Sequence, residues 1–239
     1  MAASQSKESS PVPSKRSILS RLKLLGVPIS EVVDVGVRES TLDLIEAFPD
    51  HFHHLFEPVA TFFQDIDRNY SNVQHLLYPI ALSDRDENRF LSVTSLNRDG
   101  VATHSRIVDK FIPVDGKEVI ACSPIDVRRF DSLDDVFRAD FLLKVDVDGF
   151  DLEVLKGCGL RLKKASVVII EATFLDFCQR TSFLEENGFQ LVDIVDMAYY
   201  GSTLYQFDLA FIRRDLVNQS IRPPIDRFEP SLWRAFFPD

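Results

Sequence analysis

Strand-like and helix-like patterns alternate along most of this chain, and this alternation constrains its fold more than any other feature. Short apolar runs typical of buried strands occupy residues 31–36, 53–58, 73–82, 141–147 and 166–172. Segments with the apolar spacing of amphipathic helices lie at residues 18–25, 40–48, 59–70, 151–158 and 176–188. This order predicts an α/β fold, in which helices cover both faces of a mostly parallel central sheet. Two further strands, at residues 189–195 and 206–214, have no convincing helix between them and predict an antiparallel edge.

The length of the chain favours a single domain. The sequence has 239 residues, 45% of them hydrophobic, and we place the domain at residues 18–217. Residues 1–17 are small, polar and interrupted by proline, so we expect a disordered leader. Residues 89–123 break the alternation with a polar stretch, which predicts an inserted, lid-like region. The tail at residues 218–239 either folds back over the sheet or mediates self-association as a homodimer, and the sequence leaves both open.

Composition excludes several classes of protein. The net charge is −10 and the basic residues are dispersed, which argues against a nucleic-acid partner. No apolar run approaches the roughly 18 residues that span a bilayer, so we expect no membrane segment. Cys122, Cys158 and Cys178 are scattered, with no spacing typical of a disulfide framework or a zinc site. Scattered cysteines without a disulfide pattern are typical of a reducing compartment, so we expect a cytoplasmic protein.

Acidic residues gather at the predicted strand ends. The residues at these positions are Asp34 with Gly36, then Glu57, Ser83 with Asp84, Asp146 with Asp148, and Glu171. In open α/β sheets, ligands bind outside the carboxyl ends of the strands. The sequence therefore predicts an acid-lined binding site at this edge of the sheet.

The spacing of two of these positions suggests a nucleoside ligand. Glu57 follows the turn at Asp34 and Gly36 by roughly 20 residues, the arrangement in which an acid binds the hydroxyls of a ribose. The turn has one glycine where a dinucleotide fingerprint has three, so a nucleoside without a diphosphate fits better. S-adenosylmethionine is such a molecule, and an acid-lined cleft favours its positive sulfonium and ammonium groups.

Five short stretches, in this order, resemble one family. "VVDVG", "LFEPV", "ALSD", "LLKVDVDGFDLEVLKG" and "VVIIEA" are similar to stretches of the FkbM-type S-adenosylmethionine-dependent methyltransferases, and the similarity covers roughly Glu31 to Arg214. The most specific stretch is the fourth, where Asp148 stands in place of the usual glutamate. The first loop departs from the family pattern D-V-G-A-N-x-G, because Val37, Arg38 and Ser40 replace its alanine, asparagine and second glycine.

The resemblance implies a Rossmann-like class I methyltransferase fold and a role for each acid. It implies that Asp34 and Gly36 shape the loop beside the methionine part of the cofactor. It also implies that Glu57 binds the ribose hydroxyls. Ser83 and Asp84 would face the adenine.

The expected reaction is methyl transfer to a hydroxyl of a small molecule or sugar. By resemblance, Asp146 and Asp148 lie nearest the transferred methyl group, and a buried carboxylate beside another acid has the raised pKa that suits a base. His104, as a neutral imidazole in the lid-like region, is a further candidate for the base. Alternatively, Asp146, Asp148 and Glu171 hold one Mg²⁺ that polarises the hydroxyl. We expect Lys144 to be structural, with its ammonium beside an acid.

Two other functions remain open from the sequence. A nucleotide-sugar glycosyltransferase would use the "DVD" of Asp146 and Asp148 to bind the metal that holds a diphosphate. A catalytically inactive binding protein of the methyltransferase fold would explain the altered first loop. The histidines of "HFHH", at residues 51–54, precede the second strand, at the wrong end of the sheet for the cleft, so we expect no metal site there.

Overall fold

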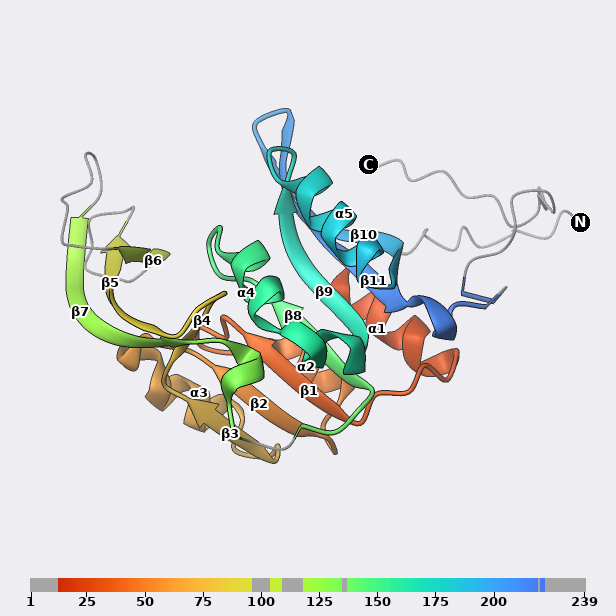
Figure 1. Cartoon of the computed structure of the whole chain (residues 1–239), viewed down its shortest axis with the longest axis horizontal. Helices are drawn as coiled ribbons and strands as arrows, with labels where there is room; N and C mark the ends of the chain where they lie inside the picture. Colours follow the sequence, from red (N-terminus) through yellow and green to blue (C-terminus); the bar gives the residue numbers. More distant parts are fainter. Residues whose placement is uncertain (1–12, 96–103, 109–117, 135–136, 219, 222–239) are drawn as a thin grey trace, which may run out of the picture.

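The computed structural model describes residues 13–95, 104–108, 118–134, 137–218 and 220–221. Side chains at 104–107, 118 and 120 are outside this description. The chain forms a seven-stranded sheet with helices on both faces and a separate four-stranded sheet (Figure 1). Among the described residues, no helix combines the length and apolarity needed to cross a membrane.

The central sheet is mostly parallel. Its strands are β1 (Glu31–Val35), β2 (Phe52–Phe56), β3 (His75–Tyr78), β8 (Phe141–Val145), β9 (Ala165–Thr173), β10 (Phe189–Tyr200) and β11 (Thr203–Arg213). They lie in the order β10-β11-β9-β8-β1-β2-β3, and β11 runs antiparallel to both of its neighbours. The predicted α/β fold, with a parallel sheet and an antiparallel pair at one edge, is confirmed.

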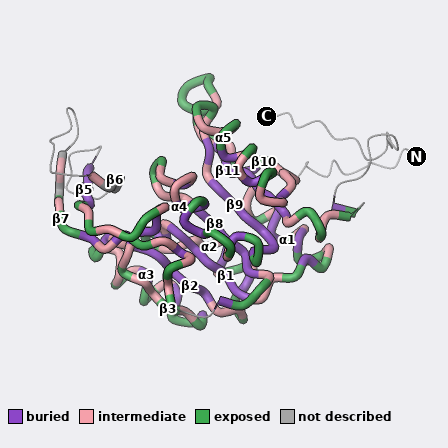
Figure 2. Tube along the Cα trace, in the orientation of Figure 1, coloured by how far each residue is buried: buried purple, intermediate pink, exposed green. Residues whose placement is uncertain are grey.

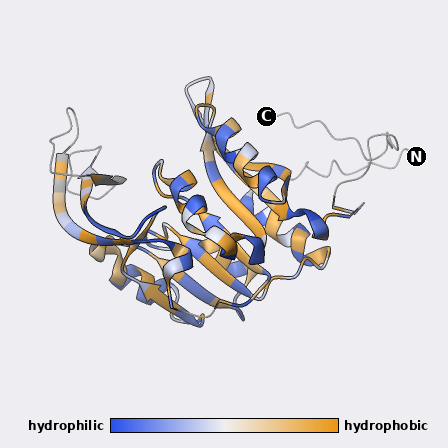
Figure 3. Ribbon diagram, viewed as in Figure 1, coloured by the Kyte–Doolittle hydropathy of each residue, from blue (hydrophilic) through white to orange (hydrophobic). Residues whose placement is uncertain are grey.

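Each central strand is apolar on both faces because both faces are covered. Val32, Leu142 and Ile169 pack in one core with the apolar side of α1, whereas Val33 and Ile170 pack in the other. The helices are α1 (Lys15–Leu24), α2 (Leu42–Ala47), α3 (Phe63–Asn69), α4 (Asp151–Gly157) and α5 (Phe177–Glu186). Short 3₁₀ turns lie at η1 (Ala60–Phe62), η2 (Phe130–Ser132), η3 (Gly159–Lys164) and η4 (Arg214–Leu216). The strands are accordingly buried in Figure 2, and β9 is strongly apolar in Figure 3.

The first helix begins at Lys15, within the segment predicted as a leader. Ser14 caps it, because its Oγ accepts a hydrogen bond from the backbone N–H of Ser17 at 3.1 Å, and the Ser17 hydroxyl donates back to the Ser14 carbonyl. The amphipathic pattern from Ile18 onward is confirmed, and Ile18 is buried against the sheet. Residues 1–12 of the predicted leader lie outside the described residues, as do 222–239 of the predicted tail.

The predicted strand at residues 73–82 is two strands that join different sheets. Pro79 cannot donate a ladder hydrogen bond, so β3 ends before it, and β4 (Ala81–Leu82) pairs with β7 instead. The second sheet has the order β4-β7-β5-β6, with β5 (Glu87–Ser95), β6 (His104–Val108) and β7 (Glu118–Arg128). Most of the described part of the predicted lid-like region is therefore strand, and residues 96–103 and 109–117 lie outside the description.

Candidate active site

A cavity of about 320 Å³ opens at the carboxyl ends of β1, β2 and β8, where the sequence places its acids. This volume lies within the range of ligand pockets, which begins near roughly 300 Å³. The lining residues are Val35, Gly36, Arg38, Phe56, Glu57, Pro58, Phe62, Ile80, Ala81, Leu82, Leu91, Val93, Asp146, Val147, Asp148, Phe150, Glu171 and Gln206.

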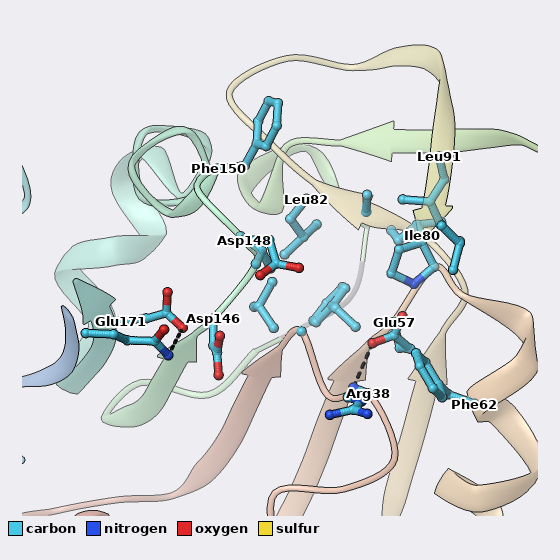
Figure 4. A pocket seen from close by; sticks show the side chains of 18 residues that line it. Arg38, Glu57, Phe62, Ile80, Leu82, Leu91, Asp146, Asp148, Phe150 and Glu171 are labelled. Atoms are coloured by element: carbon cyan, nitrogen blue, oxygen red, sulfur yellow. Dashed lines mark hydrogen bonds between the residues drawn. The ribbon is translucent and has the colours of Figure 1, made fainter. Parts of the chain in front are cut away.

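The cavity has a polar side and an apolar side (Figure 4). Asp146 and Glu171 lie together on one side, and Ile80, Leu91 and Phe62 lie on the other. The second sheet contributes to the apolar side, because Leu91 belongs to β5. A ligand with one apolar end and one polar or positively charged end would match this division.

Gly36 brings the loop after β1 against the end of β8. Its φ of 82° lies in the left-handed region, and a Cβ built on it would be 1.9 Å from the backbone oxygen of Asp146. No side chain fits there, so glycine allows the two backbones to form one wall of the cavity. The N–H of Gly36 donates to the carbonyl of Phe56 at 3.0 Å, which also ties the loop to β2.

Asp34 and Lys144 lie beneath this loop, in adjacent parallel strands. Asp34 is fully buried, and its Oδ1 is 3.1 Å from the Nζ of Lys144. Lys144 also donates to the carbonyl of Gly36 at 2.7 Å, and Tyr70 donates its hydroxyl to Asp34 at 3.3 Å. Burial opposes the charge of Lys144, but Asp34 and Asp146 outweigh it and raise the pKa of the ammonium. The expected structural role of Lys144 matches this geometry, and Asp34 supports the cavity from below without lining it.

Glu57 reaches the cavity from the end of β2. Its Oε2 accepts the backbone N–H of Arg38 at 2.7 Å and its Oε1 accepts that of Val59 at 2.9 Å. Each carboxylate oxygen has two lone pairs, so both keep capacity for hydroxyl donors from a ligand. Burial raises the pKa of Glu57 to about 7, against the effect of these two amides.

Arg38 occupies the altered part of the first loop. Its φ of 54° is in the left-handed region, which costs a non-glycine residue about 1–2 kcal/mol. Its backbone N–H binds Glu57, and its guanidinium carbon lies 5.9 Å from the centre of the Phe62 ring. The side chain therefore packs at the rim, next to the apolar side.

Asp146 and Glu171 form the polar side of the cavity. Their carboxyl groups lie together, and the Nε2 of Gln206 donates to Glu171 Oε2 at 2.8 Å (Figure 4). Burial together with the charge of Asp146 raises the pKa of Glu171 to about 9. For Asp146, Lys144 and Glu171 outweigh burial and hold the pKa of the carboxyl below its usual range. The expectation of a raised pKa at Asp146 is therefore wrong, and the raised pKa belongs to Glu171 instead.

The other predicted site residues lie in different surroundings. Asp148 is exposed on the turn after β8, with a φ of 50°, and it lines the cavity. Ser83 and Asp84 are not among the lining residues, since Ile80, Ala81 and Leu82 form that wall. The backbone of Ser83 packs against Gly157, and Asp84 pairs with Arg85 at 3.1 Å.

Neither the predicted metal set nor His104 gains support here. Among the described residues, no group of three His, Cys, Asp or Glu side chains could hold a metal ion, so Asp148 does not join Asp146 and Glu171 in such a group. His104 pairs with Thr94 through its backbone in β6, but its side chain lies outside the described residues.

Sequence reasoning missed Gln206 and the apolar wall. Gln206 lies within a strand that reads as edge structure, and nothing in its spacing marks it as a site residue. Leu91 and Val93 lie in the region expected to be a polar, lid-like insertion, where the structure has strand β5. The alternation in "RFLSV" is the one signal that could have placed Leu91 and Val93 on a common face.

The fold and the site together define a class. The strand order with one antiparallel strand next to the edge and the acid after β2 are those of a Rossmann-like class I S-adenosylmethionine-dependent methyltransferase. Residues 32–191 match the family model described as the methyltransferase FkbM domain. The chain belongs to the FkbM methyltransferase family.

Several solved structures are similar to this chain at low sequence identity. A ribosomal protein L11 methylase from Lactobacillus delbrueckii subsp. bulgaricus is 11% identical, with a TM-score of 0.45 over 84% of this chain and 77% of that chain. A magnesium protoporphyrin IX methyltransferase from Synechocystis PCC 6803 with bound S-adenosylmethionine is 12% identical, with a TM-score of 0.46 over 83% and 77%. A TehB-like methyltransferase from Corynebacterium glutamicum is 10% identical, with a TM-score of 0.40 over 84% and 88%. Among curated proteins, none matches the chain.

The residues present fit S-adenosylmethionine. Apolar side chains form one wall, where an adenine ring can be buried, and Glu57 has acceptor capacity next to it. The acids of the polar side suit a ligand that carries positive charge. The apolar wall and the acids lie at opposite sides of one cavity, and the adenine and the positively charged groups lie at opposite ends of S-adenosylmethionine.

Proposed function

We propose that this protein transfers a methyl group from S-adenosylmethionine to a hydroxyl group of a small molecule or sugar. The observation that carries the proposal is the position of the Asp146 carboxylate, on the polar side of the cavity whose other side fits a nucleoside. Membership of the FkbM family supports the donor and the reaction class.

In this proposal the chain binds the donor through three features. Glu57 accepts hydrogen bonds from the ribose hydroxyls, and the apolar side around Ile80 and Leu91 buries the adenine. The loop at Gly36 lies along the methionine part. When bound, S-adenosylmethionine supplies a methyl carbon on a positively charged sulfur, which a hydroxyl oxygen attacks in line.

The chain's main chemical task is then to orient the acceptor and to take up its proton. Fixing two reactants in a reactive geometry supplies several kcal/mol of the barrier reduction. Asp146 is partly open to the cavity, whereas Asp34 is buried beneath the loop, so Asp146 is the carboxylate available to the acceptor hydroxyl. Because its neighbours on this side are acids, an uncharged acceptor fits better than a phosphorylated one.

Two observations weigh against the other functions considered from the sequence. The family match covers most of the strands that form the cavity, which favours a methyltransferase over a nucleotide-sugar glycosyltransferase. Retention of Glu57 and of the glycine turn favours a binding-competent protein despite the altered loop. A protein that binds the donor without turnover would be the inactive alternative, and the experiment below separates it.

The test is transfer of radioactive methyl from labelled S-adenosylmethionine to a panel of neutral polyols, sugars, amines and phosphorylated sugars. We expect label on hydroxyl acceptors, loss of transfer in Asp146→Asn, and no effect of Asp67→Asn, an exposed aspartate on α3. Donor binding with no labelled product in any class would support the inactive alternative. Label confined to amines would contradict the proposed acceptor.

A further inference from the structure

The register of the sheet places Asp146 and Glu171 side by side. Val145 in β8 pairs with Ile170 in β9, and one further residue along each parallel strand reaches Asp146 and Glu171. The two carboxyl groups lie together on the polar side of the cavity (Figure 4), and two carboxylates that share a site repel each other when both are ionised, which favours one proton on the pair. The pair therefore holds one proton in its resting state.

The charges around the pair decide which residue carries this proton. Lys144 Nζ lies 3.6 Å from Asp146 and favours the ionised form there. Within the described part of the chain no ion pair joins the Glu171 carboxyl to a cation, and the charges of Asp151 and Asp208 act on it in addition to that of Asp146. The charged groups acting on the pair include Lys144 of β8, Lys15 of α1, Asp151 of α4 and Asp208 of β11. Arg180 of α5 lies nearby, where it donates to the backbone carbonyl of Glu171 and pairs with Asp151. Burial and these acids raise the pKa of Glu171 to about 9, so Glu171 is neutral and Asp146 ionised near pH 7.

The hydrogen bond from Gln206 orients the neutral acid. Its amide Nε2 donates to Glu171 Oε2 at 2.8 Å, so this oxygen serves as an acceptor. The proton of Glu171 then resides on the other oxygen, from which it can be donated to Asp146. In the β9–β11 ladder Asp208 lies opposite Glu171, and Gln206 lies opposite Thr173, two residues further along and on the same face, so its side chain reaches Glu171 diagonally.

We propose that Glu171 is a positioning residue that stays a neutral acid, is oriented by Gln206, and donates to Asp146, so that the Asp146 carboxylate is held ionised toward the acceptor. This role rests on the proposed methyl transfer, in which the acceptor O–H bond breaks and its proton passes to Asp146. The oxygen lone pair forms the C–O bond to the methyl carbon, and the C–S pair stays on sulfur. The proton then leaves Asp146 to solvent through its exposed edge.

Infrared difference spectroscopy of the whole chain between pH 8 and pH 10 tests the assignment without an acceptor. The wild type should show the carbonyl band of a protonated carboxylic acid that disappears near pH 9. Glu171→Gln should lack this band, and the matched control Glu186→Gln, an exposed glutamate of α5, should keep it. In Gln206→Leu the band should move to higher frequency, because the carbonyl loses its hydrogen-bond donor.

Three outcomes would overturn the assignment: no acid band in the wild type at pH 8, an unchanged band in Glu171→Gln, or an unshifted band in Gln206→Leu. Circular dichroism of each variant establishes that it is folded. Calorimetric titration with S-adenosylhomocysteine separates this inference from the proposed function. A wild type that shows the acid band and binds no S-adenosylhomocysteine would contradict the proposed function while leaving the protonation of Glu171 established.

Discussion

Lys144 and Asp34 form a buried ion pair, 3.1 Å from nitrogen to oxygen, directly beneath the loop that begins the cavity. Both side chains are almost completely buried, and the same ammonium donates to the carbonyl of Gly36 at 2.7 Å. The pair therefore connects the interior of the sheet to the loop. Its stability should determine the shape of the donor site.

Lys144→Met should lower the free energy of unfolding by about 3–5 kcal/mol, because it leaves Asp34 as an uncompensated buried charge. Urea denaturation measures the change. The matched control is Lys156→Met, whose half-exposed ammonium lies 3.9 Å from Glu153 and should contribute less than about 1 kcal/mol. Equal losses for the two variants would contradict the structural role of Lys144.

Gly36→Ala should destabilise the protein and abolish binding of S-adenosylhomocysteine. The new Cβ would lie 1.9 Å from the carbonyl oxygen of Asp146, and the φ of 82° is unfavourable for alanine. Strain and overpacking together should cost roughly 3 kcal/mol. Gly201→Ala has a similar φ of 62° with nothing within 4 Å, so thermal denaturation should report a loss of only about 1 kcal/mol. A Gly36→Ala variant as stable as Gly201→Ala would show that the two backbones can separate.

Stability should fall as the pH rises from about 4.5 toward 9, in part because of Glu171. Its pKa in the folded protein is about 9 and its ordinary value is 4.5, so the folded state binds more protons in this window. Deprotonation therefore favours the unfolded state as pH rises. Glu171→Gln should flatten this part of the profile in urea denaturation at several pH values. A wild-type slope that Glu171→Gln leaves unaltered would contradict a neutral Glu171.

The affinity for S-adenosylhomocysteine should increase as the pH rises through about 7. Burial raises the pKa of Glu57 to about 7, and hydrogen bonds from ribose hydroxyls favour the ionised carboxylate. Calorimetry from pH 6 to pH 8 measures the trend, and Glu57→Gln should remove it. An affinity that is constant with pH in the wild type would indicate that Glu57 does not bind the ribose.

The fold could be predicted from the sequence because its strongest signals are local. Buried parallel strands such as β8 and β9 are continuous apolar runs, and α4 and α5 have helical spacing. The second sheet could not be predicted in the same way. Its register depends on pairing between β5 and β7, which are distant in sequence, and on the break at Pro79.

The candidate site could be predicted only in part from the sequence, for a similar reason. Glu57 and Asp146 follow apolar runs, so their places at the sheet edge were predictable. The hydrogen bond between Glu171 and Gln206 crosses an antiparallel pair whose register no motif reveals. The burial that separates Asp34 from the cavity depends on Tyr70 and Lys144, which the strand pattern alone does not place.

Calorimetric titration with S-adenosylhomocysteine at pH 8 tests the central claim most directly, with wild type, Glu57→Ala and Glu39→Ala compared. Glu39 is an exposed glutamate of the same loop, so Glu39→Ala controls for the loss of one negative charge near the cavity. We predict binding by the wild type, nearly unchanged binding by Glu39→Ala, and a loss on the order of 100-fold in Glu57→Ala, which removes two hydrogen bonds to a charged group. No binding by the wild type, or equal binding by wild type and Glu57→Ala, would contradict this claim.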